Sequence, residues 1–182
     1  MSCPHLTRRR FVAGSGAMIV TAGCIGGDEE APAVEPIDLG DGQTCDVCGM
    51  VIAEHYGPNA LVFYADDRPE DRDGPAWFDS VRERLDFDED QGARGWEALG
   101  YFVTDYSAVE YELIDENGDR FISSHVEAGD FVDAEDAVFV VDSPVQGAMG
   151  PDYFPFSARD DAEHFAAEEG GTVRTWDALT SA

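Results

Sequence analysis

A pattern of a buried strand, a loop and a helix that begins with aromatic residues occurs twice in this sequence. The first copy spans residues 60–86 and the second spans residues 137–169. Because a strand and a helix bury their apolar faces against each other, two such copies predict an α+β fold. We therefore expect two small strand–helix units packed together, at about residues 44–100 and 101–180. The repeat could be an internal duplication, which would make the units homologous, or a chance similarity.

Apolar runs and turn signals predict the elements of these units. Short runs of β-branched and aromatic residues predict strands at residues 60–65, 99–104, 109–114, 120–125 and 137–141. Helical spacing and a capping-box pattern predict helices at residues 75–86, with Trp77 and Phe78 facing inward, and from Ser157 to about Glu169. Turns are expected at Asn117-Gly118 and Gly170-Gly171, and acidic loops at residues 66–73 and 86–95.

The charge of the chain is extreme. It has 39 acidic residues against 11 basic ones, all of them arginine, and a formal net charge of -28. Nucleic-acid binding is excluded because the sequence offers no basic patch to contact phosphates. The chain still has 43% hydrophobic residues. This composition indicates a folded halophilic protein of archaeal type, whose self-repulsion is screened over ~3 Å in 1 M salt. Disorder is the alternative, and it applies best to residues 28–43.

The first 23 residues resemble an export signal and are set aside from the fold. Thr7-Arg8-Arg9-Arg10-Phe11-Val12 has a twin-arginine pattern. The apolar stretch after it is too short for a membrane-spanning helix, which needs ~20 residues. Thr21-Ala22-Gly23-Cys24 resembles a lipobox, which predicts cleavage before Cys24 and a lipid on that cysteine; a secretory signal without lipid is the alternative. We expect twin-arginine export and a lipid-anchored protein on the extracytoplasmic face of the membrane.

Residues 24–43 separate this signal from the predicted folded part. They are rich in glycine, proline and acidic residues and have no apolar periodicity. We therefore expect a lipid-anchored flexible tether. Removal of the signal would leave Met50 and Met149 as the only methionines, and Cys45 and Cys48 as the only thiols free of lipid.

The segment Cys45-Asp46-Val47-Cys48-Gly49-Met50 places two thiols and a thioether within six residues. Soft sulfur ligands of this kind favour Cu(I) over harder cations. A zinc ribbon would need a second pair of ligands at matching spacing, and the sequence has no second cysteine pair. A thioredoxin-type motif should open a helix, whereas this segment precedes an apolar run. A structural disulfide is a further alternative, although so small a ring adds little loop-entropy stabilisation.

Two more residues are candidate ligands. Met149 is a lone methionine, and such residues are usually core filler. It lies, however, in a glycine-rich loop, and loops held by a scaffold often carry binding residues. His55 follows Met50 by five residues and could complete a Cys/Met/His set. His125 and His164 are weaker candidates, and the carboxylates are too numerous for any pair to be singled out.

Together these motifs resemble the NosL family over roughly residues 43–175. The resemblance rests on the signal and lipobox, Cys45-x-x-Cys48-Gly49-Met50, Phe78-Asp79-Ser80, Met149-Gly150, and a late helix that ends in Gly170-Gly171. It implies a copper chaperone for nitrous oxide reductase, built from two small α+β units, that binds one Cu(I) through Cys, Met and His. By position the implied ligands are Cys48, Met50 and Met149, then Cys45. The acidic loops look like insertions.

The sequence therefore predicts a binding protein and not an enzyme. The expected function is to carry Cu(I) outside the cell and deliver it to a client copper enzyme, with nitrous oxide reductase or its assembly proteins as the implied partner. The rival interpretation is a membrane-anchored thiol–disulfide oxidoreductase that uses Cys45 and Cys48. A thiol pKa well below ~8.5, the free value, would favour the rival.

Overall fold

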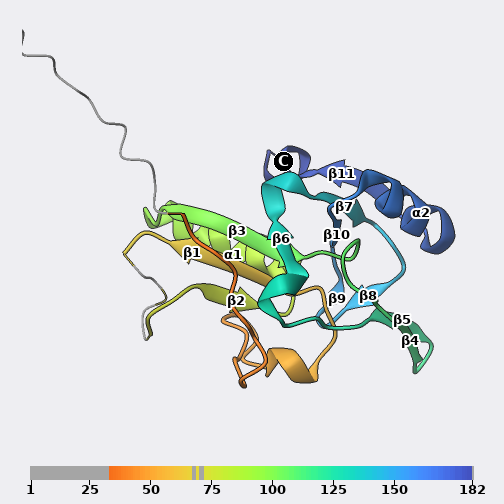
Figure 1. Cartoon of the computed structure of the whole chain (residues 1–182), viewed down its shortest axis with the longest axis horizontal. Helices are drawn as coiled ribbons and strands as arrows, with labels where there is room; N and C mark the ends of the chain where they lie inside the picture. The colour runs from red at the N-terminus through yellow and green to blue at the C-terminus, as the bar shows by residue number, and fades with distance from the viewer. Residues whose placement is uncertain (1–32, 67–68, 70–71, 182) are drawn as a thin grey trace, which may run out of the picture. The chain divides into compact units, whose positions relative to one another are not determined.

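The computed structural model describes residues 33–66, 69 and 72–181 (Figure 1). The strands are β1 (Ala60–Tyr64), β2 (Ala76–Phe78), β3 (Ala98–Thr104), β4 (Leu113–Glu116), β5 (Asp119–Ile122), β6 (Phe131–Asp133), β7 (Val138–Val141), β8 (Gln146–Gly147), β9 (Gly150–Pro151), β10 (Phe154–Phe156) and β11 (Thr172–Thr175). The helices are α1 (Val81–Ala93), α2 (Arg159–Glu169), α3 (Trp176–Thr180) and the 3-10 turns η1 (Ile52–Glu54), η2 (Ala128–Asp130) and η3 (Ala134–Asp136). The predicted signal peptide and Cys24 lie outside the described residues.

The repeated sequence pattern corresponds to two sets of elements with the same chain path. In the first set β1, β2, α1 and β3 follow one another, and the strand order is β2-β1-β3. The second set has the same succession of two strands, a helix and a strand, in β7, β10, α2 and β11, and its strand order is β10-β7-β11. All four strand pairs are antiparallel. The α+β class and the two strand–helix units are thus confirmed, while their homology stays a prediction.

The two sets also share one detail of register. Phe78, the last residue of β2, pairs with Ala60 at the start of β1. Phe156, the last residue of β10, pairs with Val138 at the start of β7. Both phenylalanines are fully or almost fully buried, and each is followed within three residues by a helix.

The boundary predicted between the units, at about residue 100, falls within a strand. β3 runs through residue 100 to Thr104 and pairs with β1 over most of its length. β6, from the predicted second unit, joins the first sheet by pairing with β3. The strands at 60–65, 99–104 and 137–141 are confirmed to within a residue, and that at 120–125 is shorter, at β5. The strand predicted at 109–114 begins only at Leu113.

The first helix was misplaced in the sequence-based prediction of residues 75–86. Trp77 and Phe78 lie in the strand β2, and the helix begins at Val81 after the N-cap Ser80, whose Oγ accepts a hydrogen bond from Glu83 N at 3.1 Å. The predicted acidic loop 86–95 is largely helical, because α1 continues to Ala93. A helix can carry many acidic side chains on its solvent face while its other face packs against the core. The acidic composition of residues 86–95 was therefore not evidence for a loop.

The second helix and the hairpin agree better with prediction. Asn117 and Gly118 have the positive φ angles, 54° and 98°, that a tight hairpin requires. α2 ends at Glu169, before Gly170. The predicted capping box at Ser157 is absent: the N-cap residue is Ala158, without a side-chain cap. Instead Ser157 N donates to Asp105 Oδ1 and Ala158 N donates to Ser107 Oγ.

The flexible tether predicted for residues 24–43 does not extend to Gln43. Leu39 is fully buried in the main hydrophobic cluster, and Val34 and Ile37 pack against that cluster. Leu39 N also donates to Val126 O at 2.7 Å. From Val34 onward this segment belongs to the folded part; residues 24–32 lie outside the described residues.

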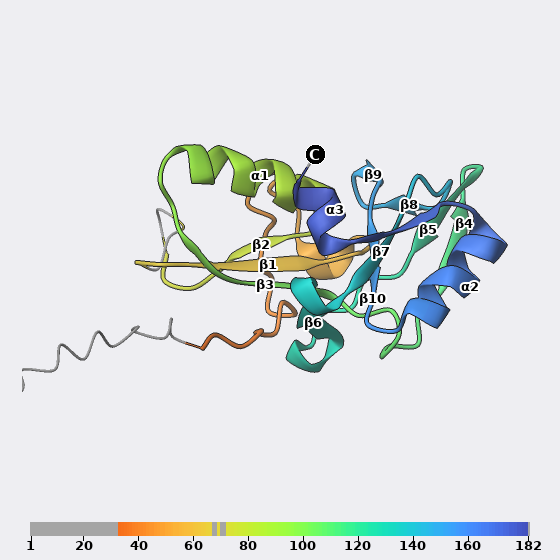
Figure 2. The same ribbon diagram turned by 90° about the horizontal axis from the view of Figure 1, so that it is seen from above.

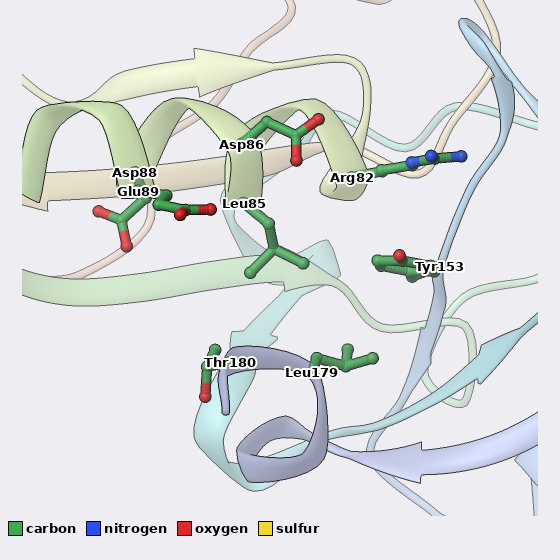
Figure 3. Close-up of a pocket in the computed structure, with 8 residues that line it drawn as sticks. All are labelled: Arg82, Leu85, Asp86, Asp88, Glu89, Tyr153, Leu179 and Thr180. Carbon is green, nitrogen blue, oxygen red and sulfur yellow. The ribbon is translucent and has the colours of Figure 1, made fainter. Parts of the chain in front are cut away.

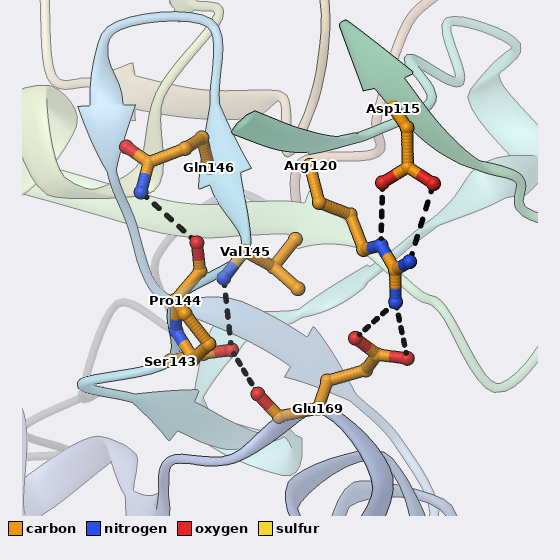
Figure 4. A network of polar contacts seen from close by, with 7 residues as sticks. All are labelled: Asp115, Arg120, Ser143, Pro144, Val145, Gln146 and Glu169. Carbon is orange, nitrogen blue, oxygen red and sulfur yellow. Dashed lines mark hydrogen bonds and ion pairs between the residues drawn. The ribbon is translucent and has the colours of Figure 1, made fainter. Parts of the chain in front are cut away.

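A third sheet, in the order β4-β5-β8-β9, is attached to the second unit. Figure 4 shows the attachment: the Arg120 guanidinium binds Asp115 of β4 and Glu169 at the end of α2. Ser143 Oγ donates to the main-chain oxygen of Glu169, and Val145 N donates to Ser143 Oγ. This sheet carries Met149, at the turn between β8 and β9.

Among the described residues, no helix has the length and apolar character needed to cross a membrane.

Candidate metal centre

The cysteine segment forms a tight hairpin. Thr44 and Val51 make a β-bridge, Cys45 N donates to Met50 O at 2.8 Å, and Gly49 N donates to Cys45 O at 2.9 Å. Gly49 has a φ angle of 76°, a conformation that glycine adopts without strain. The Cys-x-x-Cys-Gly spacing therefore folds both thiols back to one side of the turn.

A charged clamp holds this hairpin against β2. Asp46 accepts two hydrogen bonds from the Arg72 guanidinium, at 2.7 and 2.6 Å, and one from Trp77 N at 2.9 Å. The guanidinium lies 3.6 Å from the centre of the Trp77 ring. The Trp77 indole N–H donates to Thr44 O at 2.8 Å. Because the clamp uses groups from three segments, the cysteines have a fixed place on the first sheet.

The two thiols meet two carboxylates from the beginning of α1. The Cys48 thiol lies 3.4 and 3.5 Å from the oxygens of Asp79, and the Cys45 thiol lies 3.7 Å from Glu83 Oε2. One ligand atom from each of the four residues lies within 4.8 Å of the others. Asp79 is fully buried, Cys45 is buried, and Cys48 and Glu83 are half-buried. The group is therefore a compact S₂O₂ donor set that opens to solvent on the Cys48 side.

Both cysteines are free thiols in this structure. Burial raises the pKa of Cys45 far above its ordinary value, against the opposing effect of N–H groups of Cys48, Asp79 and Val47 that point to the sulfur. Burial likewise raises the pKa of Cys48, while the Met50 N–H and the Cys45 thiol lower it. Burial, and to a smaller extent the negative charge of Asp79, raises the pKa of Glu83. The N–H groups are poised to stabilise thiolates once a cation replaces the protons.

Sequence reasoning did not single out Asp79 and Glu83, the two carboxylates that lie beside the thiols. A signal was present in Ser80-x-x-Glu83, the spacing of an N-cap and its third helical residue. Recognising that cap would have placed Asp79 just before the helix and Glu83 in its first turn, on the side that the hairpin covers. The Glu83 carboxylate faces the Cys45 thiol, where the usual capping box would direct it to the N-cap backbone.

The structure places the two methionines differently. Met50 is half-buried at the end of the cysteine hairpin, and its backbone closes the hairpin. Met149 is 44% exposed at the β8–β9 turn. Three residues later, Asp152 Oδ1 accepts a hydrogen bond from Arg82 N in the first turn of α1, at 3.0 Å. Met149 is thus on a turn tied to the same end of α1 that carries Asp79 and Glu83.

The histidines lie elsewhere. His55 is exposed after η1 and lines a cleft of about 470 Å³ with Tyr56, Ile114 and other residues, none of which belongs to the S₂O₂ donor set. Within the described part of the chain, His55 does not belong to the group of ligand atoms within 4.8 Å. His125 Nε2 lies 3.1 Å from Ser123 Oγ, and burial lowers the pKa of His125. The structure therefore gives the His55 assignment no support.

Asp152 gives the apo protein an expected pH dependence. Burial raises the pKa of this carboxyl to about 7. The folded state then holds a proton that the unfolded state has released above pH ~4, so the group's contribution to stability falls as the pH rises from ~4 to about 7. We expect Asp152→Asn, which cannot ionise, to gain stability relative to wild type over this range, by up to about 4 kcal/mol. Chemical denaturation at several pH values would measure the difference, and a constant difference would contradict it.

Comparisons with known proteins point to one family. The chain matches the model of the NosL family over residues 36–182. It is 31% identical to the copper-binding lipoprotein NosL of Achromobacter cycloclastes, over 97% of this chain and 82% of that protein. It is 26% identical to the copper-binding lipoprotein NosL of Stutzerimonas stutzeri, over 88% and 74% of the two chains.

A solved structure has the same fold. The crystal structure of the copper chaperone NosL from Shewanella denitrificans superposes with a TM-score of 0.58 at 26% identity, covering 80% of this chain and 93% of that one. The family match spans both strand–helix units, the cysteine hairpin and the Met149 turn. This chain belongs to the NosL family.

Proposed function

We propose that this protein binds Cu(I) as cargo at the cysteine hairpin and delivers copper to a client enzyme outside the cell. The observation that carries the proposal is the pair of free thiols, Cys45 and Cys48, held together at an open edge of the fold. Thiolates are soft ligands that select Cu(I). The relatives named as copper-binding lipoproteins and as a copper chaperone support copper as the metal.

The proposed ligands are Cys45 and Cys48 with a methionine, Met50 or Met149. Cys48 is half-buried and Met149 is exposed, so a partner can reach these sulfurs from solvent. A client would take the metal by replacing one sulfur ligand at a time. Such transfer suits an exposed hairpin and an exposed turn better than a deep pocket, and it needs no catalytic residue.

The finer parts of the proposal rest on sequence patterns. The resemblance to NosL supports nitrous oxide reductase, or its assembly proteins, as the client. The twin-arginine and lipobox patterns support export and a lipid on Cys24 at the outer face of the membrane. The names of the lipoprotein relatives agree with that location.

The rival, a thiol–disulfide oxidoreductase, is less well supported. Such enzymes attack with a cysteine of lowered pKa, usually at a helix N-terminus. Here the thiols lie in a turn before η1, and burial raises the pKa of both Cys45 and Cys48. An insulin-reduction assay separates the two functions: the oxidoreductase would be active in it, whereas the carrier would not.

The proposal is tested by titrating the fully reduced protein with Cu(I) against a chromogenic Cu(I) chelator. We expect a single tight site per protein, because one hairpin supplies both thiols. Failure to compete with the chelator after complete reduction would reject copper carriage and would leave an inert structural lipoprotein as the better interpretation.

A further inference from the structure

The turn that carries Met149 is attached to the first unit through one buried carboxylate. Asp152 follows β9 directly and is 3% exposed. Its Oδ1 accepts from Arg82 N at 3.0 Å and from Tyr153 N at 2.7 Å. Arg82 is the second residue of α1, so Asp152 satisfies one of the free N–H groups at the start of that helix. Asp152, which directly follows the third sheet, thus caps part of the N-terminus of α1 in the first unit.

Packing around the carboxylate fixes the turn further. A Cβ atom placed on Gly147, in β8, would lie 2.8 Å from Asp152 Oδ2 and 2.9 Å from Gly57 O. Only glycine fits there, so β8 lies directly against the carboxylate. Asp152 Oδ2 is buried and has no hydrogen-bond partner among the described residues. A buried acceptor left unpaired lowers stability, so Asp152 adds less stability than its two backbone hydrogen bonds alone would suggest.

The place of contact relates Asp152 to the metal centre. The turn of α1 that it caps also contains Glu83, which faces the Cys45 thiol, and follows Asp79, which faces the Cys48 thiol. Figure 3 shows Arg82 and Tyr153, whose backbone N–H groups donate to Asp152, at one end of the cleft of about 430 Å³ between α1 and α3. In Figure 2 the labels β8 and β9 stand beyond the same end of α1. Three extended residues span only about 10 Å, so Met149 stays near this end.

We propose that Asp152 is a positioning residue that holds the Met149 turn where its thioether can join the cysteines in binding Cu(I). The inference rests on the proposed function, because it assumes that the cysteines bind copper. It adds that the methionine ligand depends on a contact between the two units, made by a side chain that does not touch the metal. Metal sites lose about 10–100-fold in affinity when such supporting contacts are removed.

A double-mutant cycle tests whether Asp152 acts on Cu(I) affinity through Met149. Cu(I) affinity is measured by chelator competition for wild type, Asp152→Ala, Met149→Leu and the double variant. We expect Asp152→Ala alone to lower the affinity by about 10–100-fold, and to lower it less than about two-fold in the Met149→Leu background. Leucine matches methionine in volume, so Met149→Leu removes the thioether with little change in packing, and both thiols remain to bind copper.

The matched control is Asp105→Ala. Asp105 is equally buried, at 6% exposure, and its Oδ1 also accepts two backbone N–H groups, those of Ser107 and Ser157. These contacts involve no residue of β8, β9 or the Met149 turn. Asp105→Ala should lower the melting temperature, because two backbone N–H groups lose their acceptor, yet leave the Cu(I) affinity within about two-fold of wild type. A similar affinity loss in both variants would mean a general effect of destabilisation and would overturn the proposal.

Two further variants keep the test decisive. If Asp152→Ala does not fold, Gly147→Ala takes its place in the cycle, because its Cβ displaces β8 from the carboxylate. Asp152→Asn keeps an oxygen that can accept from Arg82 N and should retain the wild-type affinity.

Three results would contradict the proposals. If Asp152→Ala lowers the Cu(I) affinity equally in the wild-type and Met149→Leu backgrounds, the inference is overturned but copper carriage is not. If Met149→Leu leaves the Cu(I) affinity unchanged, the inference is overturned and Met149 is not a ligand. If the wild-type protein does not bind copper, the proposed function itself is rejected.

Discussion

Replacing Cys48 with serine is expected to lower the affinity for Cu(I) by at least about 100-fold, more than the loss that follows when only a supporting contact is removed. A serine hydroxyl is a hard donor that stays protonated at neutral pH, so it cannot replace a thiolate on Cu(I). Cys48 is half-buried, and serine can still donate a hydrogen bond to Asp79. The substitution should therefore change metal binding more than folding. Chelator competition, with circular dichroism of each variant, measures both effects.

The control for this variant lies between the cysteines. Val47 is 49% exposed, and Val47→Ala leaves both sulfurs and the hairpin hydrogen bonds in place. Its affinity should stay within about two-fold of wild type. Cys45→Ser should lower affinity as Cys48→Ser does and also reduce stability, because Cys45 is buried in the main hydrophobic cluster. If Cys48→Ser retained wild-type affinity, Cys48 would not be a ligand and the hairpin would not be the copper site.

The second large effect is expected at Leu39. This side chain is fully buried, and removing a buried leucine side chain typically costs 2–5 kcal/mol, so Leu39→Ala should lower the free energy of unfolding by about that amount. Urea denaturation followed by tryptophan fluorescence would measure the loss, since Trp77 and Trp96 pack against the same cluster. The matched variant is Glu35→Ala, at an exposed position four residues earlier, which should change stability by less than about 0.5 kcal/mol.

This experiment decides where the tether ends. If Leu39→Ala unfolds at the wild-type urea concentration, the segment before Thr44 is a linker and its packing contributes nothing. If the expected loss is found, a chain that begins at Thr44 lacks part of its core. The folded part then begins by about Val34, and not after residue 43, where the composition placed the end of the tether.

The sequence alone predicted some elements better than others. The runs that became β1, β3 and β7 are apolar and β-branched or aromatic, so local preference and burial agree there. Trp77 and Phe78 misled the prediction because two adjacent aromatics after a proline suit either a helix start or a short strand. Trp77 and Phe78 form a strand because they pair with Leu61 and Ala60 of β1, which lie 16 and 18 residues away in the chain.

The same contrast holds for the metal centre. Cys45 and Cys48 were identifiable because cysteines are rare here and the two lie with Met50 within six residues. Asp79 and Glu83 were not, because the chain has 39 acidic residues and composition does not show which of them lie beside sulfur. Their role emerges only when α1 begins at Val81 and the cysteine hairpin is clamped to β2 by Asp46 and Arg72.

The sequence by itself thus determined the repeated strand–helix pattern, the group of sulfur residues at 45–50 and the resemblance to the family, since each rests on short motifs that can be recognised without the fold. The tertiary structure decided which carboxylates face the thiols, that Leu39 belongs to the core, and that Asp152 ties the Met149 turn to α1. The physical reason is that burial and hydrogen bonding between distant segments depend on how the units pack, which no local pattern of residues specifies.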